Sequence, residues 1–143
     1  MHWIDNIILG LIESFNTQNV YELCDCLDIE IRCVEPHSPL LNKNKSFYYR
    51  IFGEKEIIFI NGKLENPLKD FIIKHELGHA LLHTNILYSS MCNTGKLERQ
   101  ANYFALRLSN ITFDEVELQG MTLNQIANCL QLPYEPLKQL VNL

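Results

Sequence analysis

Two histidines and a glutamate with the spacing of a metal site occur together in His75-Glu76-Leu77-Gly78-His79. Positions four apart in a helix differ by about 40° around the axis, so both imidazoles would lie on one side, one turn apart. Two ring nitrogens on that side can bind one zinc ion, and Glu76 lies at the edge of the same face. We therefore predict that His75 and His79 bind Zn²⁺ and that Glu76 is the catalytic general base.

A catalytic zinc ion needs a third protein ligand and an open fourth position. Glu98 begins the next predicted helix, and the small residues Ala101 and Ala105 on its face would let the two helices approach closely. We predict that Glu98 is the third ligand. We also predict that Asn102, one turn further on, hydrogen-bonds the second ring nitrogen of a ligand histidine. The outer side of this helix is expected to carry Arg99, Gln100, Tyr103 and Arg107.

His83 and three later acids are weaker candidates for the metal. His83 has turned about 80° from His75 around the helix, so one ion is hard for both to reach together with His79. It would either line the cleft or close the helix end, or remain a partly exposed histidine favoured by the helix dipole. The acids compete with Glu98 but lie in a poorly patterned stretch that is typical of a surface: Asp114, Glu115 and Glu117.

The segments that must position these residues alternate between helical and strand-like patterns. The predicted helices span Ile4–Phe15, Val20–Leu27, Asn66–His83, Lys96–Leu108, Leu123–Leu130 and Glu135–Val141, and the predicted strands span Ile29–Val34, Ser46–Phe52 and Lys55–Ile60. Gly53-Glu54 between the last two strands indicates an antiparallel hairpin. This order predicts an α+β domain with a small antiparallel sheet packed beside the long helix.

The long helix is apolar nearly all round. Ile73, Leu77 and Ala80 lie opposite the two imidazoles, and Phe71 flanks the metal face. A helix with this pattern is buried, and polar groups inside a protein are costly without partners. A metal ion would supply one such partner to the histidines.

Composition and charge bound the functions open to this chain of 143 residues. Its 12 Lys and Arg residues are scattered among 17 Asp and Glu residues, for a net charge of −5, so direct nucleic-acid binding is disfavoured. No apolar run approaches the roughly 20 residues that span a bilayer, and Met1–Phe15 resembles an amphipathic helix more than a signal peptide. Five cysteines, an odd number, indicate no disulfide framework. We expect a cytoplasmic protein with no membrane contact.

We expect a single domain over residues 1–143, with a catalytic core at about 1–110 and a helical extension at about 111–143. The last two helices have the cadence of a helix-turn-helix unit, with Gln125-Ile126-Ala127 followed by Leu132-Pro133. Only Lys138 offers a basic side chain in the second of them, whereas DNA reading needs phosphate contacts. We interpret this part as a packing or partner-recognition element.

Three segments in combination resemble the ImmA/IrrE family of metallopeptidases. They are Ile58-Phe59-Ile60-Asn61, the run from His75 to His83, and the run from Glu98 to Ala105. The likeness covers about Leu23 to Leu108. It implies a zincin fold of the gluzincin type, with zinc ligands at His75, His79 and Glu98 and with Glu76 as catalytic acid and base. It also implies a phage or mobile-element setting in bacteria, where such proteins are partnered with a helix-turn-helix repressor whose cleavage releases silenced genes.

The expected activity is therefore that of a zinc-dependent endopeptidase. The sequence does not choose among His83, Tyr88 and Tyr134 as a second donor to the developing oxyanion. One alternative is a non-catalytic, metal-containing module that sequesters a regulator, and a toxin with another target is a third possibility. The intact Glu76 argues against the sequestering module, because a structural metal site has no use for a base beside two imidazoles.

Overall fold

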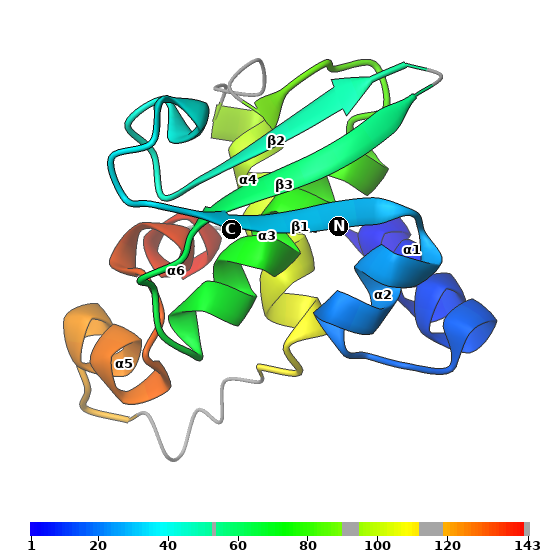
Figure 1. Cartoon of the computed structure of the whole chain (residues 1–143). Coiled ribbons are helices and arrows are strands. Elements are labelled where there is room, and N and C mark those ends of the chain that lie inside the picture. Colours follow the sequence, from blue (N-terminus) through cyan, green and yellow to red (C-terminus); the bar gives the residue numbers. More distant parts are fainter. Residues whose placement is uncertain (53, 90–94, 112–118, 142–143) are drawn as a thin grey trace.

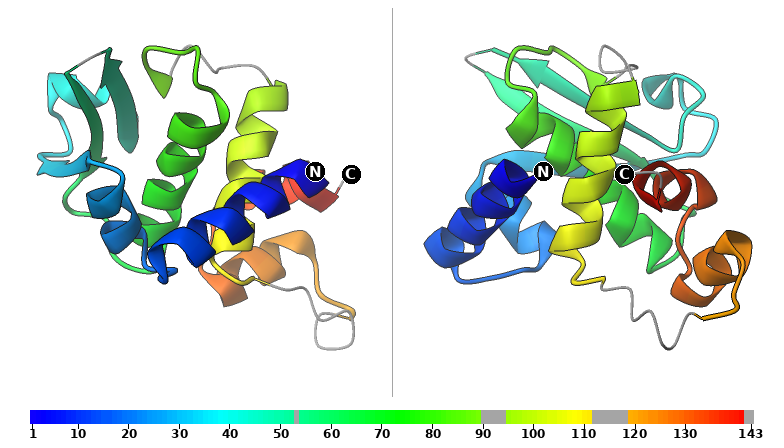
Figure 2. Two further views of the ribbon diagram at one scale, coloured as in Figure 1. Left: turned by 90° about the vertical axis from the view of Figure 1, so that its right-hand side faces the viewer. Right: turned by 180° about the vertical axis from the view of Figure 1, so that it is seen from behind.

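A small sheet, a long helix and a second helix form three successive layers (Figures 1 and 2). The computed structural model describes residues 1–52, 54–89, 95–111 and 119–141. Helix α3 (Leu68–Leu82) lies between the sheet and α4 (Gly95–Leu108), as the left view of Figure 2 shows most directly. The predicted α+β class is confirmed, and the helix that carries the two motif histidines is the middle layer.

The sheet is mixed, with strand order β1-β3-β2. Strand β3 (Lys55–Asn61) pairs antiparallel with β2 (Ser46–Ile51), which confirms the predicted hairpin, although Gly53 in its turn lies outside the described residues. Strand β1 (Ile29–Val34) pairs parallel with β3, with Ile31 opposite Ile58. The prediction of a wholly antiparallel sheet is therefore wrong for β1.

The path of the chain explains the parallel pair. The connection from β1 includes the short helix η1 (Pro39–Leu41), and the chain enters β2 on the far side of β3. Strand β2 runs opposite to β1, and the hairpin then reverses the chain once more. Strand β3 therefore runs in the same direction as β1. Leu41 packs on one face of β3 against Ile57 and Phe59, while Ile58 and Ile60 face the main core. The central strand is thus buried on both faces, which suits its run of apolar residues.

The predicted burial of α3 is confirmed, because eight of its residues between Phe71 and Ala80 are buried. The helix begins at Leu68, two residues later than the predicted start at Asn66, and its N-cap is Pro67; the Asn66-Pro67 peptide bond is cis. At the other end His83 is the C-cap, and its backbone N–H donates to the carbonyl of His79. His83 therefore closes the helix end, which is one of the three possibilities considered for it.

The remaining helices surround this central pair. Helices α1 (His2–Phe15) and α2 (Val20–Cys26) flank it on one side, and α5 (Leu123–Leu130) and α6 (Tyr134–Val141) pack against the α3–α4 pair on the other (Figure 1). Asp5 of α1 accepts hydrogen bonds from Tyr103 Oη and Arg107 Nε on α4. Leu132 and Leu137 join Phe71 and Leu106 in a second apolar cluster. Among the described helices, none is both long and apolar enough to cross a bilayer.

Candidate metal centre

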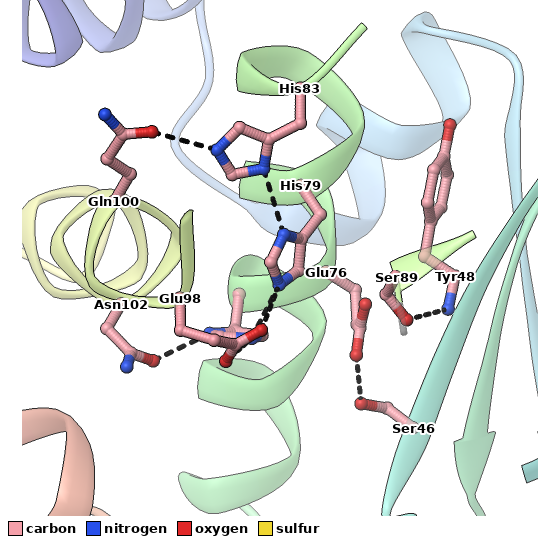
Figure 3. Close-up of polar contacts among 10 residues, drawn as sticks. Ser46, Tyr48, Glu76, His79, His83, Ser89, Glu98, Gln100 and Asn102 are labelled. Carbon is pink, nitrogen blue, oxygen red and sulfur yellow. Dashed lines mark hydrogen bonds and ion pairs between the residues drawn. The ribbon is translucent and has the colours of Figure 1, made fainter. Parts of the chain in front are cut away.

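Helices α3 and α4 bring two imidazoles and one carboxylate to a single point. His79 Nε2 lies 3.1 Å from His75 Nε2 and 3.1 Å from Glu98 Oε1. His75 Nε2 lies 3.4 Å from Glu98 Oε2. One candidate ligand atom from each residue can be chosen so that all three lie within 4.8 Å of one another. These are the three residues that the sequence predicted as metal ligands, and Figure 3 shows Glu98 reaching from α4 toward His79.

The separations suit a tetrahedral ion. In a tetrahedral zinc site with bonds of about 2.0–2.1 Å, neighbouring ligand atoms lie about 3.3 Å apart. The two nitrogen–oxygen distances and the nitrogen–nitrogen distance, 3.1 to 3.4 Å, are close to that spacing. His79 is 1% exposed and Glu98 is 31% exposed, so one side of the cluster is closed by protein and the other is open. The three donors can therefore hold a divalent metal and leave a coordination position accessible.

A glycine lets the two helices approach closely enough for this cluster. A Cβ atom at Gly78 would lie 3.2 Å from Ala101 Cα and 3.3 Å from the Ala101 carbonyl oxygen. The predicted close approach at Ala101 is thus present, and Gly78 on α3 is its counterpart. Because Gly78 lies next to His79 and Ala101 lies one turn after Glu98, this contact sets the distance between ligands on different helices.

The electrostatics of the cluster favour a cation. Burial alone would lower the pKa of His75, but its hydrogen bond with Glu98 and the negative charges of Glu76 and Glu98 raise that pKa above its ordinary value. Burial would raise the pKa of Glu98, yet hydrogen bonds and charge interactions with His75 and His79 lower it to about 2. The carboxylate is thus ionised and ready to bind positive charge, which is what a metal ligand requires.

Glu76 lies beside the cluster with half of its carboxylate unpaired. It is 4% exposed, and its Oε1 accepts a hydrogen bond of 2.5 Å from the Ser46 hydroxyl (Figure 3). Its Oε2 is buried and has no hydrogen-bond partner in the described part of the chain. A buried carboxylate oxygen is costly unless a hydrogen-bond partner, such as a water in the cleft, satisfies it. The arrangement suits a base that takes a proton from a water in the cleft. Nothing in the sequence pattern identified Ser46.

The second nitrogens of both histidines also have partners. His75 Nδ1 lies 2.7 Å from Asn102 Oδ1, the kind of contact that the sequence predicted for Asn102. His79 Nδ1 lies 3.0 Å from His83 Nδ1, and His83 Nε2 lies 3.0 Å from Gln100 Oε1 (Figure 3). The prediction that Gln100 points outward is therefore wrong. Burial lowers the pKa of His83, which favours the neutral ring. The side chain is buried, so His83 is not the partly exposed histidine of the alternative.

A cleft of about 650 Å³ opens beside the cluster. Its floor includes His75, Glu76 and Glu98, and its walls come from residues 43–46 before and at the start of β2 and from Pro133, Glu135 and Pro136 around the start of α6. Among the described residues that line the cleft, none is one of the three oxyanion-donor candidates, His83, Tyr88 and Tyr134. The rival acids Asp114, Glu115 and Glu117 lie outside the described residues.

The fold and the site together define a class of protein: an α+β domain in which two packed helices bring two histidines and a glutamate close enough to hold a metal ion, beside an open cleft. Comparison with known proteins narrows this class. The family model for the IrrE N-terminal-like domain, Peptidase M78, matches residues 24–143. The chain therefore belongs to the ImmA/IrrE family of metallopeptidases. The match continues past Leu108, where the resemblance seen in the sequence ended, and includes α5 and α6.

Two relatives agree with this membership. Metallopeptidase ImmA of Bacillus subtilis (strain 168) is 31% identical over 139 residues, which cover 91% of this chain and 79% of that protein. Uncharacterized immunity region protein 2 of Bacillus phage phi105 is 29% identical over 103 residues, which cover 68% of this chain and 62% of that protein. No solved structure matches the chain.

Proposed function

We propose that this protein is a zinc-dependent endopeptidase that cleaves a partner helix-turn-helix repressor in the bacterial cytoplasm and so derepresses phage or mobile-element genes. In this proposal His75, His79 and Glu98 bind the zinc ion and Glu76 is the catalytic acid and base. Asn102 and His83 orient the two histidines.

The observation that carries the proposal is the buried, unpaired Oε2 of Glu76 next to the three convergent donor groups. A purely structural metal site would need only the donors. A carboxylate that is 4% exposed and faces a cleft of about 650 Å³ has a use if a water enters and loses a proton to it.

When bound, a zinc ion would supply Lewis acidity, which polarises a peptide carbonyl and acidifies a nearby water. Glu76 Oε2 would accept the proton of that water as the water oxygen attacks the carbonyl carbon. Ser46, through its hydrogen bond to Oε1, would keep the carboxylate from turning away. Glu76 would then give the proton to the leaving amine nitrogen as the carbon–nitrogen bond breaks, which leaves one new carboxyl group and one new amino group.

The choice of substrate rests on family membership and on the phage relative. The name of the phi105 protein places it in an immunity region, and ImmA carries the name of a metallopeptidase. A peptidase associated with immunity is most simply used to remove a repressor. The cleft is open on the surface, as a segment of another folded protein would require.

The alternative is a non-catalytic, metal-containing module that sequesters a regulator. Such a module would act at one copy per target, whereas an enzyme acts at substoichiometric amounts. The two alternatives therefore differ in a quantity that a single titration measures.

The test is metal content and repressor cleavage for the wild type, Glu98→Ala and Glu76→Gln. Each purified protein is analysed for zinc and then mixed at a ratio of about one to fifty with the repressor encoded beside its gene, and fragments are followed by mass spectrometry. We expect about one zinc per wild-type chain, loss of zinc in Glu98→Ala, and retained zinc without cleavage in Glu76→Gln. Full zinc in Glu98→Ala would show that the third ligand is wrong. Stoichiometric trapping without fragments would support the sequestering module.

A further inference from the structure

The most buried ligand candidate, His79, is tied to α4 through a second histidine. His79 is 1% exposed, and its Nδ1 lies 3.0 Å from Nδ1 of His83, which is 8% exposed. His83 Nε2 in turn lies 3.0 Å from Oε1 of Gln100. Figure 3 shows these groups in a row, from His79 through His83 to the Gln100 side chain on α4.

With Gln100 Oε1 facing His83 and with both rings neutral, the positions of the ring hydrogens follow. An amide oxygen only accepts, so His83 Nε2 must carry the hydrogen that points at Gln100. A neutral imidazole carries one N–H, which leaves His83 Nδ1 as an acceptor. The hydrogen between the two rings therefore belongs to His79 Nδ1. The lone pair of His79 is then on Nε2, the atom that faces His75 and Glu98.

We propose that His83 and Gln100 are positioning residues that hold His79 in the tautomer and orientation needed to bind a metal ion through Nε2. This inference rests on the proposed metal role of His79. Neither residue touches the ion or the substrate in this assignment. They act through His79: His83 Nδ1 accepts the hydrogen bond from His79 Nδ1–H, and Gln100 Oε1 accepts the one from His83 Nε2–H.

The direction of the Gln100 amide decides which ring nitrogen of His79 carries the hydrogen. If its NH₂ group faced His83, every hydrogen in the row would reverse, and His79 Nε2 would carry a hydrogen where the metal must bind. An acceptor at residue 100 is therefore required, and a side chain of similar size without an acceptor should weaken the site. His75 needs no such relay, because Oδ1 of Asn102, which lies on α4 like Gln100, contacts His75 Nδ1 directly at 2.7 Å.

In this arrangement α4 carries three of the described groups at the cluster, while His83 at the end of α3 links one of them to His79. Glu98 is the third ligand candidate, Asn102 contacts one histidine, and Gln100 reaches the other through His83. Such partners of ligand histidines typically change metal affinity 10- to 100-fold when they are removed. The expected effect is thus on metal affinity first, and on catalysis only as a consequence.

The experiment measures Zn²⁺ affinity by competition with a chromophoric chelator for the wild type, His83→Leu, His83→Asn, Gln100→Leu and His37→Leu. His37 is an exposed histidine far from any motif and serves as the matched control. We expect His83→Leu and Gln100→Leu to bind Zn²⁺ about 10- to 100-fold more weakly. His83→Asn should keep most of the affinity, because its Oδ1 can stand where His83 Nδ1 accepts. His37→Leu should match the wild type.

A second readout is the ring hydrogen of His79. In zinc-loaded protein labelled with ¹⁵N-histidine, NMR should show His79 protonated at Nδ1 and His83 protonated at Nε2, and the His79 signal should lose its exchange protection in His83→Leu. If His83→Leu fails to fold without metal, His83→Asn and Gln100→Leu carry the affinity test. Wild-type affinity in both Leu variants, or a hydrogen on His79 Nε2, would overturn the relay while leaving the metal site intact. A wild-type chain that binds no Zn²⁺ would overturn the proposed function and the relay together.

Discussion

The hydroxyl of Ser46, at the first residue of strand β2, lies 2.5 Å from Oε1 of Glu76 in the middle of helix α3. This bond joins the sheet to the proposed base across 30 positions of sequence. It also divides the carboxylate into two unequal halves, because Oε1 is satisfied and Oε2 is not. A carboxylate held in this way keeps the same oxygen, Oε2, unpaired, which is what the proposed base requires.

The first prediction concerns this bond. Ser46→Ala removes the donor and leaves Oε1 buried without a partner, which should cost about 1–3 kcal/mol of folding free energy. Because the base is then free to turn, we expect repressor cleavage to slow roughly 10- to 100-fold while zinc content stays at the wild-type level. Chemical denaturation, zinc analysis and a cleavage time course measure the three quantities.

Ser89→Ala is the matched control for Ser46→Ala. Ser89 also lines the cleft, but its hydroxyl accepts from the Tyr48 backbone N–H and does not touch Glu76. It should cleave at close to the wild-type rate. Equal losses in the two variants would mean that the cleft wall matters in general, and that the Ser46–Glu76 bond has no particular role.

The second prediction concerns the contact of α3 with α4. Alanine is normally better than glycine inside a helix by about 1 kcal/mol. At Gly78, however, the new methyl group would lie 3.2–3.3 Å from the backbone of Ala101, so α4 must move away. We expect Gly78→Ala to lose that stability gain and to bind zinc at least about 10-fold more weakly, since Glu98 moves with α4.

Gly10→Ala provides the comparison for Gly78→Ala. Gly10 lies in α1, is exposed, and has no atom within 4 Å of an added Cβ. It should raise the free energy of unfolding by about 0.5–1 kcal/mol and leave zinc affinity unchanged. If Gly78→Ala behaves like Gly10→Ala in both measurements, the helix spacing does not control the metal site.

The main features of this site could be predicted because they depend on local periodicity. The i, i+4 spacing of His75 and His79 and the apolar surroundings are properties of one helix, and Glu98 opens the next helix in the chain. The close helix contact followed from the small side chain of Ala101. Each of these inferences needed only the helical repeat and the order of the elements.

The features that were missed depend on how elements cross in space. A helical wheel places Gln100 on the outer side of α4, because the wheel shows directions around one axis only. It takes no account of His83, which meets Gln100 from the end of α3. Ser46 is an ordinary serine until the sheet meets α3. Arg50, a buried strand residue, donates to the carbonyls of Ala80, Thr84 and Ile86 around the end of α3, a set of partners that no local pattern encodes. The parallel pairing of β1 likewise depends on the path of the connection through η1.

The third prediction concerns metal and stability. A ligand that binds only the folded state stabilises it, by about 2.7 kcal/mol at a free concentration of 100 Kd. For a chain of this size that corresponds to a rise of roughly 5–10 °C in Tm. Calorimetry with and without excess Zn²⁺ should show this rise in the wild type and in Glu76→Gln. Glu98→Ala should show little or none, and an equal rise in Glu98→Ala would mean that zinc binds elsewhere.

The fourth prediction concerns two cysteines of one short helix. Cys24 and Cys26 both lie in α2, but Cys24 is 1% exposed and burial raises the pKa of its thiol to about 12, whereas Cys26 is exposed. The thiolate is the reactive form, so iodoacetamide at pH 8 should modify Cys26 quickly and leave Cys24 intact until the chain is unfolded in urea.

Because the pKa of Cys24 in the folded protein is above that of an unfolded thiol, the neutral Cys24 adds stability that is fully present below about pH 8.5 and is lost as the pH rises toward 12. Peptide mapping by mass spectrometry measures the two modification rates, and unfolding curves at pH 8 and pH 10 measure the loss of stability. Cys24→Ala, which has no thiol to ionise, should lose less stability over that interval than the wild type. Equal modification rates for Cys24 and Cys26 in the folded protein would mean that α2 opens readily.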